Sequence, residues 1–163
     1  MGNQIKRIVE TCVYVYKLLD DVPHVLLKYK FKDPNKDRWV PLGAEVGLDE
    51  APYTNALKEL KAVGVNASQI ELRGLVTEIF PAEGQWILVI YVAREFEGDL
   101  KMNFDDGYVE WKAINSLSVL PKPQSDAIFG PEVLNLEKPP YEATMIFDST
   151  NKLMRVERLN DSI

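Results

Sequence analysis

The chain has 163 residues, of which 46% are hydrophobic and 27% are charged, and its formal net charge at pH 7 is -6. These values are typical of globular proteins, and the length predicts a single domain over residues 1–163 with one buried core. The excess of acidic residues argues against nucleic acid as the main partner, because binding to backbone phosphates requires an excess of Lys and Arg.

The sequence has no basic start followed by an apolar run and a cleavage site, and none of its segments reaches about 18 consecutive apolar residues. We therefore expect a cytoplasmic protein with no membrane partner. Cys12 is the only cysteine, so the chain cannot form an internal disulfide. Its position in an apolar segment predicts a buried thiol that acts as a small hydrophobe.

Two strands are expected near the start of the chain. Residues 9–19 are apolar on both alternating faces, which is typical of a central strand covered on two sides. Residues 25–32 instead place apolar side chains on one face and lysines on the other, which predicts a half-exposed strand. The lysine face has two interpretations: it makes the strand surface soluble, or it holds a polyphosphate together with Arg38.

The next segment predicts a helix from about Asp49 to Val63. The Asp49 carboxylate can accept hydrogen bonds from the free amides of the first turn, and Pro52 is tolerated there because its missing N–H is not needed. Gly64 is typical of a residue that ends a helix. The apolar residues of the segment recur at helical spacing, so we expect them to face a sheet.

The second half of the chain predicts two more strands, a helix and a hairpin. The strands are expected over residues 69–80, with a bend at Arg73-Gly74, and over residues 86–93. Residues 125–136 predict a helix that Gly130-Pro131 interrupts or delays. The closing strands of the hairpin, at residues 141–147 and 153–159, flank the turn sequence Asp-Ser-Thr-Asn. This order predicts an α/β (α+β) fold in which a mixed sheet lies between helices.

A degenerate motif spans residues 43–65. It contains a glycine, an acid, a basic residue followed by an acid, and a closing glycine with an aliphatic residue: Gly43, Asp49 or Glu50, Lys58, Glu59, Gly64 and Val65. This pattern resembles the box of the Nudix hydrolase superfamily, G-x5-E-x7-R-E-U-x-E-E-x-G-U, where U is a bulky aliphatic residue. The helical part of the motif is one residue shorter here.

The resemblance covers most of the chain. Further segments follow the order seen in bacterial Nudix proteins that are similar to 8-oxo-dGTP and related nucleotide diphosphatases: residues 73–77, 86–93, 96–100, 107–111, 117–121, 125–129 and 141–156. The resemblance implies a Nudix-like α/β/α sandwich with a mixed β-sheet and a C-terminal β-hairpin. It also implies a nucleotide-type small molecule as ligand and a homodimer as the assembly.

The metal ligands of the box are largely missing. Glutamates at positions i, i+3 and i+4 of a helix share one face, so they can converge on divalent cations. The corresponding residues are Glu59, Ala62 and Val63, which leave one carboxylate. Mg²⁺ requires oxygen ligands, and aliphatic side chains have none. Shifting the alignment by one residue supplies Lys61, which would repel a metal.

For an active site, the resemblance implies Mg²⁺ or Mn²⁺ bound by the carbonyl of Gly43 and by the carboxylates of Glu59 and Asp106. Glu59 and Asp106 would then be the catalytic residues. Asp106 is preferred over Asp105 in the loop before Gly107, although an acidic Asp-Gly turn with no metal role is an equally simple interpretation. The implied substrate-binding residues are Lys28, Lys30 and Arg38.

Other side chains near the motif have two interpretations each. Glu45 and Glu50 are further candidates for metal ligands, and an ion pair on the helix surface is the alternative interpretation of Glu50. Trp86, Phe80 and Tyr91 form either an aromatic clamp for a base or part of the core. Three functions therefore stay open: a slow metal-dependent pyrophosphohydrolase of nucleoside diphosphate derivatives, a catalytically silent nucleotide-binding module, and a protein-interaction domain.

Overall fold

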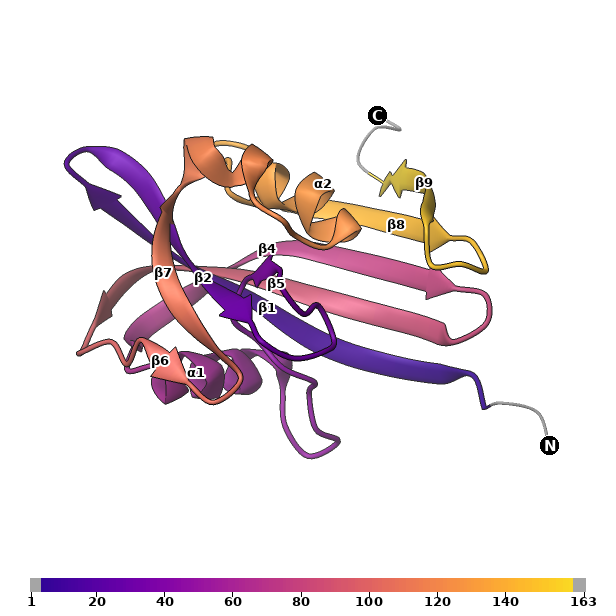
Figure 1. The fold of residues 1–163 in the computed structure, drawn as a ribbon, viewed down its shortest axis with the longest axis horizontal. Coiled ribbons are helices and arrows are strands. Elements are labelled where there is room, and N and C mark those ends of the chain that lie inside the picture. Colours follow the sequence, from indigo (N-terminus) through magenta and orange to yellow (C-terminus); the bar gives the residue numbers. More distant parts are fainter. Residues whose placement is uncertain (1–3, 160–163) are drawn as a thin grey trace.

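The computed structural model describes residues 4–159, and one mixed sheet of nine strands dominates this part of the chain. The strand order is β6-β7-β2-β1-β5-β4-β8-β9, with β3 paired to β2 beside this path (Figure 1). The elements are β1 (Lys6–Leu19), β2 (Val22–Lys30), β3 (Trp39–Val40), α1 (Pro52–Ala62), β4 (Asn66–Phe80), β5 (Gly84–Glu97), β6 (Asn103–Phe104), β7 (Gly107–Ala113), the 3-10 helix η1 (Ile114–Val119), α2 (Gln124–Val133), β8 (Tyr141–Phe147) and β9 (Leu153–Arg158).

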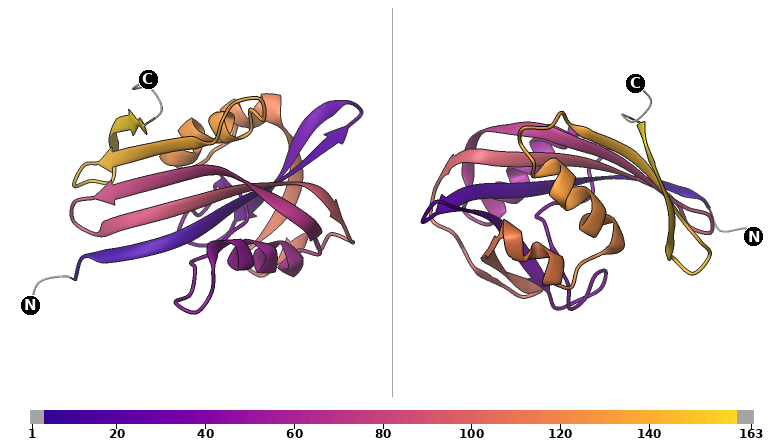
Figure 2. Two further views of the ribbon diagram at one scale, coloured as in Figure 1. Left: turned by 180° about the vertical axis from the view of Figure 1, so that it is seen from behind. Right: turned by 90° about the horizontal axis from the view of Figure 1, so that it is seen from above.

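Helices cover both faces of the sheet. Figure 2 shows α1 and α2 on opposite sides of the strands. Two separate hydrophobic clusters fill the spaces between the layers: Leu60 of α1 belongs to one cluster, and Phe129 of α2 belongs to the other. The pairs β1–β5 and β4–β8 are parallel, whereas β1–β2 and β4–β5 are antiparallel. The predicted α/β/α sandwich with a mixed sheet is thus confirmed.

The central strands follow the sequence pattern. In β1, Val13 and Val15 join the cluster under α1, while Tyr14 joins the cluster under α2. In β5, Ile90 belongs to the α2 side and Ala93 to the α1 side. Alternate side chains of a strand point to opposite faces, so an apolar run on both parities requires cover on both sides. The prediction of two central strands is confirmed.

The prediction of a half-exposed β2 is wrong. Leu26 shares the lysine face of the strand and is fully buried in the α1-side cluster, while Leu27 is buried on the other face. The reason is that the α1-side hydrophobic cluster covers the face that carries Leu26, while the other cluster covers Val25 and Leu27. Phe31 and Lys32 lie beyond the end of the strand.

Helix α1 begins at Pro52, three residues later than the Asp49 start predicted from the sequence. The residue before the helix is Ala51, and no side chain caps the first turn. Pro52 occupies the first turn as expected, since the proline needs no N–H partner there. Gly64 follows the helix with φ +85°, a conformation that favours glycine. The predicted helix end is therefore confirmed, and the predicted cap is wrong.

Helix α2 ends at Val133, earlier than the predicted residue 136, and Pro131 lies inside it. The buried Arg73 side chain accounts for the end. Its guanidinium donates hydrogen bonds to the backbone carbonyls of Val133, Asn135 and Lys138 at 3.2, 2.9 and 2.7 Å. A positive charge is favourable at the carbonyl end of a helix.

The bend predicted at Arg73-Gly74 and the terminal hairpin are both found. The register of β4 against β5 shifts between Leu72 and Gly74, and this irregularity lies beside Arg73. Strands β8 and β9 pair as an antiparallel hairpin. The Asp148 carboxylate accepts hydrogen bonds from the backbone amides of Thr150 and Lys152 at 2.8 and 3.0 Å, which stabilises the turn.

None of the helices in residues 4–159 is long and apolar enough to cross a membrane.

Candidate functional site

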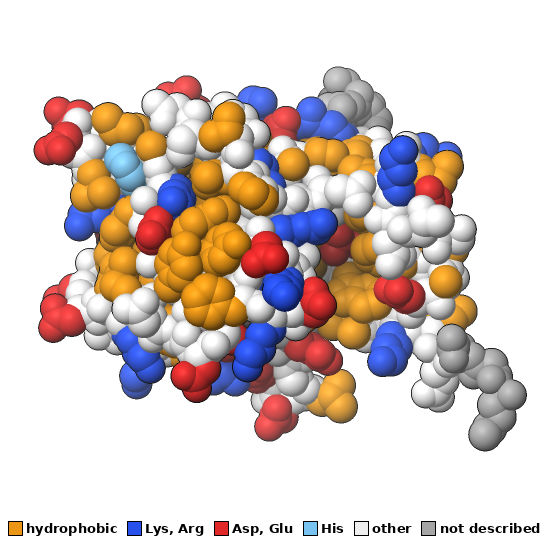
Figure 3. All heavy atoms as spheres, viewed as in Figure 1, with side chains coloured by type: hydrophobic (Ala, Val, Ile, Leu, Met, Phe, Trp, Pro, Cys, Tyr) orange, Lys and Arg blue, Asp and Glu red, His pale blue; other side chains and the backbone are white. Residues whose placement is uncertain are grey.

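A cleft of about 570 Å³ opens between the loop that precedes α1, the strand β1 and the N-terminal end of α2. Its walls come from segments that are far apart in the sequence, including residues 34–45, β4 and the turn after β8. In Figure 3, a recessed area with hydrophobic side chains lies to the right of centre, with acidic and basic side chains around it. A volume of this size is typical of sites for small organic ligands.

The loop of residues 43–50 borders the cleft and is held against β1. Gly43 has φ +147°, and a Cβ atom at this position would lie 1.8 Å from the carbonyl oxygen of Thr11. The amide of Thr11 donates a hydrogen bond to the carbonyl of Ala44 at 3.0 Å, next to this close approach. Only glycine permits this conformation at this distance. Gly43, the first glycine of the motif, therefore has a structural role: it lets the loop approach β1 closely, whether or not its carbonyl also binds a ligand.

A buried asparagine fixes the other side of the loop. Asn55 of α1 is 1% exposed, and its amide group donates to the carbonyl of Glu45 at 3.1 Å and to the Glu50 carboxylate at 2.9 Å. The Asn55 oxygen accepts a hydrogen bond from the Thr11 hydroxyl at 2.6 Å. One side chain thus ties α1, β1 and the loop together. No pattern in the sequence indicates this role, because the motif has no defined residue at this position.

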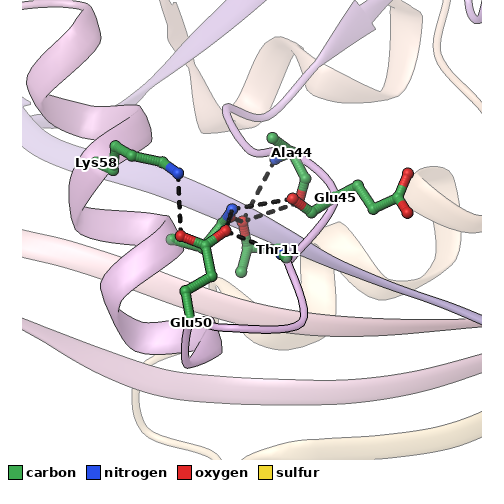
Figure 4. Close-up of polar contacts among 7 residues, drawn as sticks. Thr11, Ala44, Glu45, Glu50 and Lys58 are labelled. Carbon is green, nitrogen blue, oxygen red and sulfur yellow. Dashed lines mark hydrogen bonds and ion pairs between the residues drawn. The ribbon is translucent and has the colours of Figure 1, made fainter.

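Glu50 completes the same network. Its carboxylate accepts hydrogen bonds from the amide of Gly47 at 3.0 Å and from Lys58 at 3.0 Å (Figure 4). The Gly47 amide is the largest cause that lowers the pKa of Glu50 to about 2, followed by Asn55 and Lys58. The interpretation of Glu50 as a member of an ion pair is confirmed. Of the two acids that match the first acid of the box, Glu50 is the one that pairs with Lys58.

The deep part of the cleft contains carboxyl groups from three elements. Glu10 lies on β1, Glu78 on β4 and Asp126 on α2, and all three line the cleft. Burial raises the pKa of each, and it raises that of Asp126 to about 8, with the nearby Glu78 as the second cause. The Ser125 hydroxyl donates a hydrogen bond to Glu78. At neutral pH the Asp126 carboxyl is therefore mainly protonated, and it can donate as well as accept a hydrogen bond.

Sequence reasoning missed these acids, although a signal was present. Glu10 interrupts the apolar residues 9–19, and Glu78 stands in the predicted strand 69–80. An acid in a segment that is apolar on both faces must lie at a cleft or find a partner, because burying an isolated carboxylate is costly. That rule identifies the residues one at a time. Only the strand order brings them together.

Aromatic rings form a wall of the same region. Phe80 and Trp86 line the cleft, with ring centroids 5.3 Å apart in an edge-to-face arrangement. Phe147 stacks on Phe80 at 4.2 Å. Tyr91 lies instead in the α1-side cluster, with its ring 6.0 Å from Tyr53. The proposed aromatic clamp is therefore reduced to Phe80 and Trp86, and core packing is the correct interpretation for Tyr91.

The predicted cationic residues divide into two groups. Lys30 and Arg38 line the cleft, and the charge of Lys30 opposes the rise in the pKa of Glu10. Lys28 is absent from the cleft wall, and its ammonium lies 2.8 Å from the Asp106 carboxylate. The cleft thus has two positive side chains among its acids, both near the loop of residues 34–38.

The predicted metal ligands are likewise divided. Gly43 lines the cleft, whereas Glu59 and Asp106 do not. The hydrogen bond from Lys28 is the largest cause that lowers the pKa of Asp106. Burial raises the pKa of Glu59, and the charges of Lys58 and Lys28 oppose this rise. The roles of these residues stay predictions.

The donor set does not fit a resident divalent cation. Within residues 4–159, no group of three or more His, Cys, Asp or Glu side chains could hold a metal ion. The next two positions on the relevant face of α1 are Ala62 and Val63, and Val63 is buried in the core. Asp106 already neutralises an ammonium group. Of the two carboxylates that the resemblance assigns to the metal, Glu59 is therefore the one outside the ion pairs of residues 4–159, whereas the resemblance implies several oxygen ligands.

A second cavity of about 310 Å³ lies beside the cleft, between η1 and α2. It shares Pro41 and Asp126 with the cleft, and most of its other lining side chains are apolar. Asp126 therefore lines both the cleft and the second cavity.

Comparison with solved structures identifies proteins of the same fold. No family model matches the sequence, and no curated protein matches it. Three similar solved structures are a MutT protein from Bacillus halodurans (20% identity, 95% of this chain and 98% of that chain, TM-score 0.76), the NUDIX domain of NrtR from Shewanella oneidensis in complex with ADP ribose (18%, 82% and 90%, TM-score 0.68), and a MutT NUDIX hydrolase from Burkholderia pseudomallei (20%, 78% and 98%, TM-score 0.67). The chain therefore has the fold of the Nudix proteins.

Proposed function

We propose that this protein binds a nucleotide-type ligand in the cleft and does not hydrolyse it by the metal-dependent route. The observation that carries the proposal is the distribution of the charged residues. Lys30 and Arg38 line the cleft, while Glu59 and the Lys28–Asp106 pair do not. The groups suited to holding an anionic ligand are therefore present, whereas the two carboxylates that the resemblance implies as metal ligands lie outside the cleft, and the acids of residues 4–159 form no group of three or more that could hold a metal.

The chemistry of the cleft supports a ligand with two different ends. Arg38 and Lys30 suit phosphate oxygens, whereas Phe80 and Trp86 offer apolar surface for a planar ring. Ser125 and the protonated Asp126 add hydrogen-bonding groups to the same cleft. A nucleotide combines an anionic end with a planar, hydrogen-bonding ring. The similar NrtR domain was solved with ADP ribose, a molecule of this class.

The test is a thermal-unfolding screen with ADP-ribose, nucleoside diphosphates and nucleoside triphosphates, each in EDTA and in MgCl₂. A ligand at a hundredfold its dissociation constant adds about 2.7 kcal/mol to the free energy of unfolding, or roughly 5–10 °C for a chain of this size. We expect at least one ligand to stabilise the protein equally in both buffers. The absence of any shift across the panel would contradict the proposal.

Matched variants locate the ligand. Lys30→Met and Arg38→Met should each reduce the shift, because each removes a positive charge from the cleft. Lys32→Met is the control, since Lys32 is exposed and outside the cleft. A loss of stabilisation in the control as large as in the two cleft variants would mean that the ligand responds to overall charge and not to this site.

The alternative function is a slow pyrophosphohydrolase, and the intact loop network around Glu50 favours it, because the box loop keeps a defined conformation without its full set of acids. In that case product release with Mn²⁺ should be measurable and should be abolished in Glu59→Gln. Release of product by the unaltered protein would replace the proposal of a silent binding module with this alternative.

A further inference from the structure

The second cavity, of about 310 Å³ between η1 and α2, has a largely apolar wall. Ile114, Leu117 and Leu120 come from η1 and its C-terminal end, and Leu27 and Trp39 come from the sheet. The proposed function uses none of these side chains. A volume of roughly 300 Å³ lies at the small end of the range of ligand sites, so the space suits a molecule of one or two rings.

A buried hydroxyl group without a partner lies at this cavity. Tyr14 of β1 is 3% exposed, and it lines the second cavity but not the cleft. Among the described residues its hydroxyl makes no hydrogen bond, yet the oxygen is not fully enclosed by protein atoms. It is therefore reachable from the cavity. Because a buried polar group without a partner is costly, this hydroxyl favours a ligand atom that can pair with it.

Helix α2 leaves room beside the same hydroxyl. Gly130 lies inside α2, is buried and also lines the cavity. A Cβ atom at this position would lie 3.4 Å from the Tyr14 hydroxyl oxygen, which is a contact distance and not a collision. Alanine would therefore fit and would favour the helix, since glycine is a poor helix former. The missing side chain of Gly130 keeps the space beside the hydroxyl open.

The ionisable side chains of the wall favour an uncharged occupant. The Lys122 ammonium donates hydrogen bonds to the backbone carbonyls of Leu117 and Leu120. Burial, followed by the proximity of Glu78, raises the pKa of Asp126 to about 8, so this carboxyl is mainly protonated at neutral pH. An anion would have to compete with two carbonyls for the ammonium, and a cation would find no carboxylate. Burying a ligand charge without a free partner is costly.

We propose that this cavity binds a small, uncharged aromatic molecule with a hydroxyl group, which packs against the apolar wall and pairs with the Tyr14 hydroxyl. An aromatic ring suits the space because the rings of Tyr14 and Trp39 both line it. The inference goes beyond the proposed function, since the site needs neither a nucleotide nor a metal. Its test is therefore independent of the test of the cleft.

The experiment is a ligand-observed ¹⁹F nuclear magnetic resonance titration at neutral pH. The probes share one ring and differ in one group: 4-fluorophenol, 4-fluorotoluene and 4-fluorobenzoate. We expect the unaltered protein to bind 4-fluorophenol about three- to tenfold more tightly than 4-fluorotoluene, which is the net gain from one hydrogen bond. We expect 4-fluorobenzoate to bind more weakly than 4-fluorophenol, because its charge would have to be buried.

Two variants locate the probe. Tyr14→Phe should fold with an unchanged or higher melting temperature, since the hydroxyl has no partner to lose, and should bind 4-fluorophenol and 4-fluorotoluene with nearly equal affinity. Gly130→Ala should weaken 4-fluorophenol binding by about threefold or more, because its methyl group takes the space beside the hydroxyl. Tyr16→Phe is the matched control, since Tyr16 packs on the same face of β1 but does not line the cavity.

Three results would overturn the inference. The first is equal affinity of 4-fluorophenol for the unaltered protein, Tyr14→Phe and Gly130→Ala, because the ring would then bind elsewhere, for example in the cleft. The second is tighter binding of 4-fluorobenzoate that Lys122→Met abolishes, because the cavity would then be an anion site. The third is the absence of binding by any probe at millimolar concentration.

Discussion

The buried carboxyl cluster predicts an inverse dependence of stability on pH, and Asp126→Asn is the substitution that isolates it. Burial and the proximity of Glu78 raise the pKa of Asp126 from 3.8 to about 8. The folded protein therefore binds a proton that the unfolded chain has released, and the free energy of unfolding falls as pH rises between about 4 and 8. The full contribution of Asp126 is present below the lower of these values and lost above the upper one.

The magnitude follows from the two pKa values. At about 1.36 kcal/mol per pH unit, the difference corresponds to roughly 5 kcal/mol between pH 4 and pH 8. Glu10 and Glu78 titrate together with Asp126 and have pKa values that are raised in the same direction, so the proton and this free energy are shared within the cluster. Asn keeps the size of the side chain and cannot ionise.

The assay is urea denaturation of both proteins at pH 5, 7 and 9, with Glu137→Gln as a control at an exposed carboxyl group. We expect Asp126→Asn to gain on the unaltered protein as pH rises, so that its advantage in free energy of unfolding is larger at pH 9 than at pH 5 by a few kcal/mol. Acids with lowered pKa values, such as Glu50, titrate below this range and do not interfere. A stability that rises from pH 5 to pH 9, or a pH dependence that the substitution leaves unchanged, would refute the reasoning.

Three further substitutions test the structure around the site. Arg73→Met should cost roughly 3 kcal/mol or more in urea denaturation, because three backbone carbonyls, one at the end of α2 and two in the segment after it, lose their donor. Asn55→Ala should cost about 2–4 kcal/mol by the same measurement, since it leaves the Thr11 hydroxyl and the Glu45 carbonyl without this partner. Gly43→Ala should lower the melting temperature and weaken ligand binding together, because its Cβ atom would collide with the Thr11 carbonyl; an unchanged melting temperature would contradict the close approach.

The parts of the fold that the sequence predicted are those that depend on local patterns. Continuous apolar residues identified β1 and β5 as central strands, and a turn sequence between two short strands identified the C-terminal hairpin. The errors arise where distant residues decide. Helix α1 begins at Pro52 with no side-chain cap from Asp49, and the neighbouring Glu50 carboxylate is used by the distant groups of Gly47, Asn55 and Lys58.

The candidate site was harder to predict for the same reason. The motif supplied Gly43, and the lysine pattern with Arg38 supplied two cleft cations, all from one continuous region of the chain. Glu78 and Asp126 reach the cleft only because β4 lies beside β5 in the sheet and α2 packs over that face. Their partnership depends on topology that no spacing in the sequence contains.

Lys28 and Lys30 show most clearly what the structure adds. They are two residues apart on one strand, so the sequence assigned both to a single phosphate-binding face. In the structure Lys30 ends β2 and lines the cleft, while Lys28 pairs with Asp106 outside it. The proposed function therefore makes different demands on these two neighbouring lysines. Lys30→Met should weaken nucleotide binding in EDTA, whereas Lys28→Met should leave it largely unchanged; two variants that behave alike would show that the overall positive charge of the strand, and not the position of Lys30 in the cleft, controls binding.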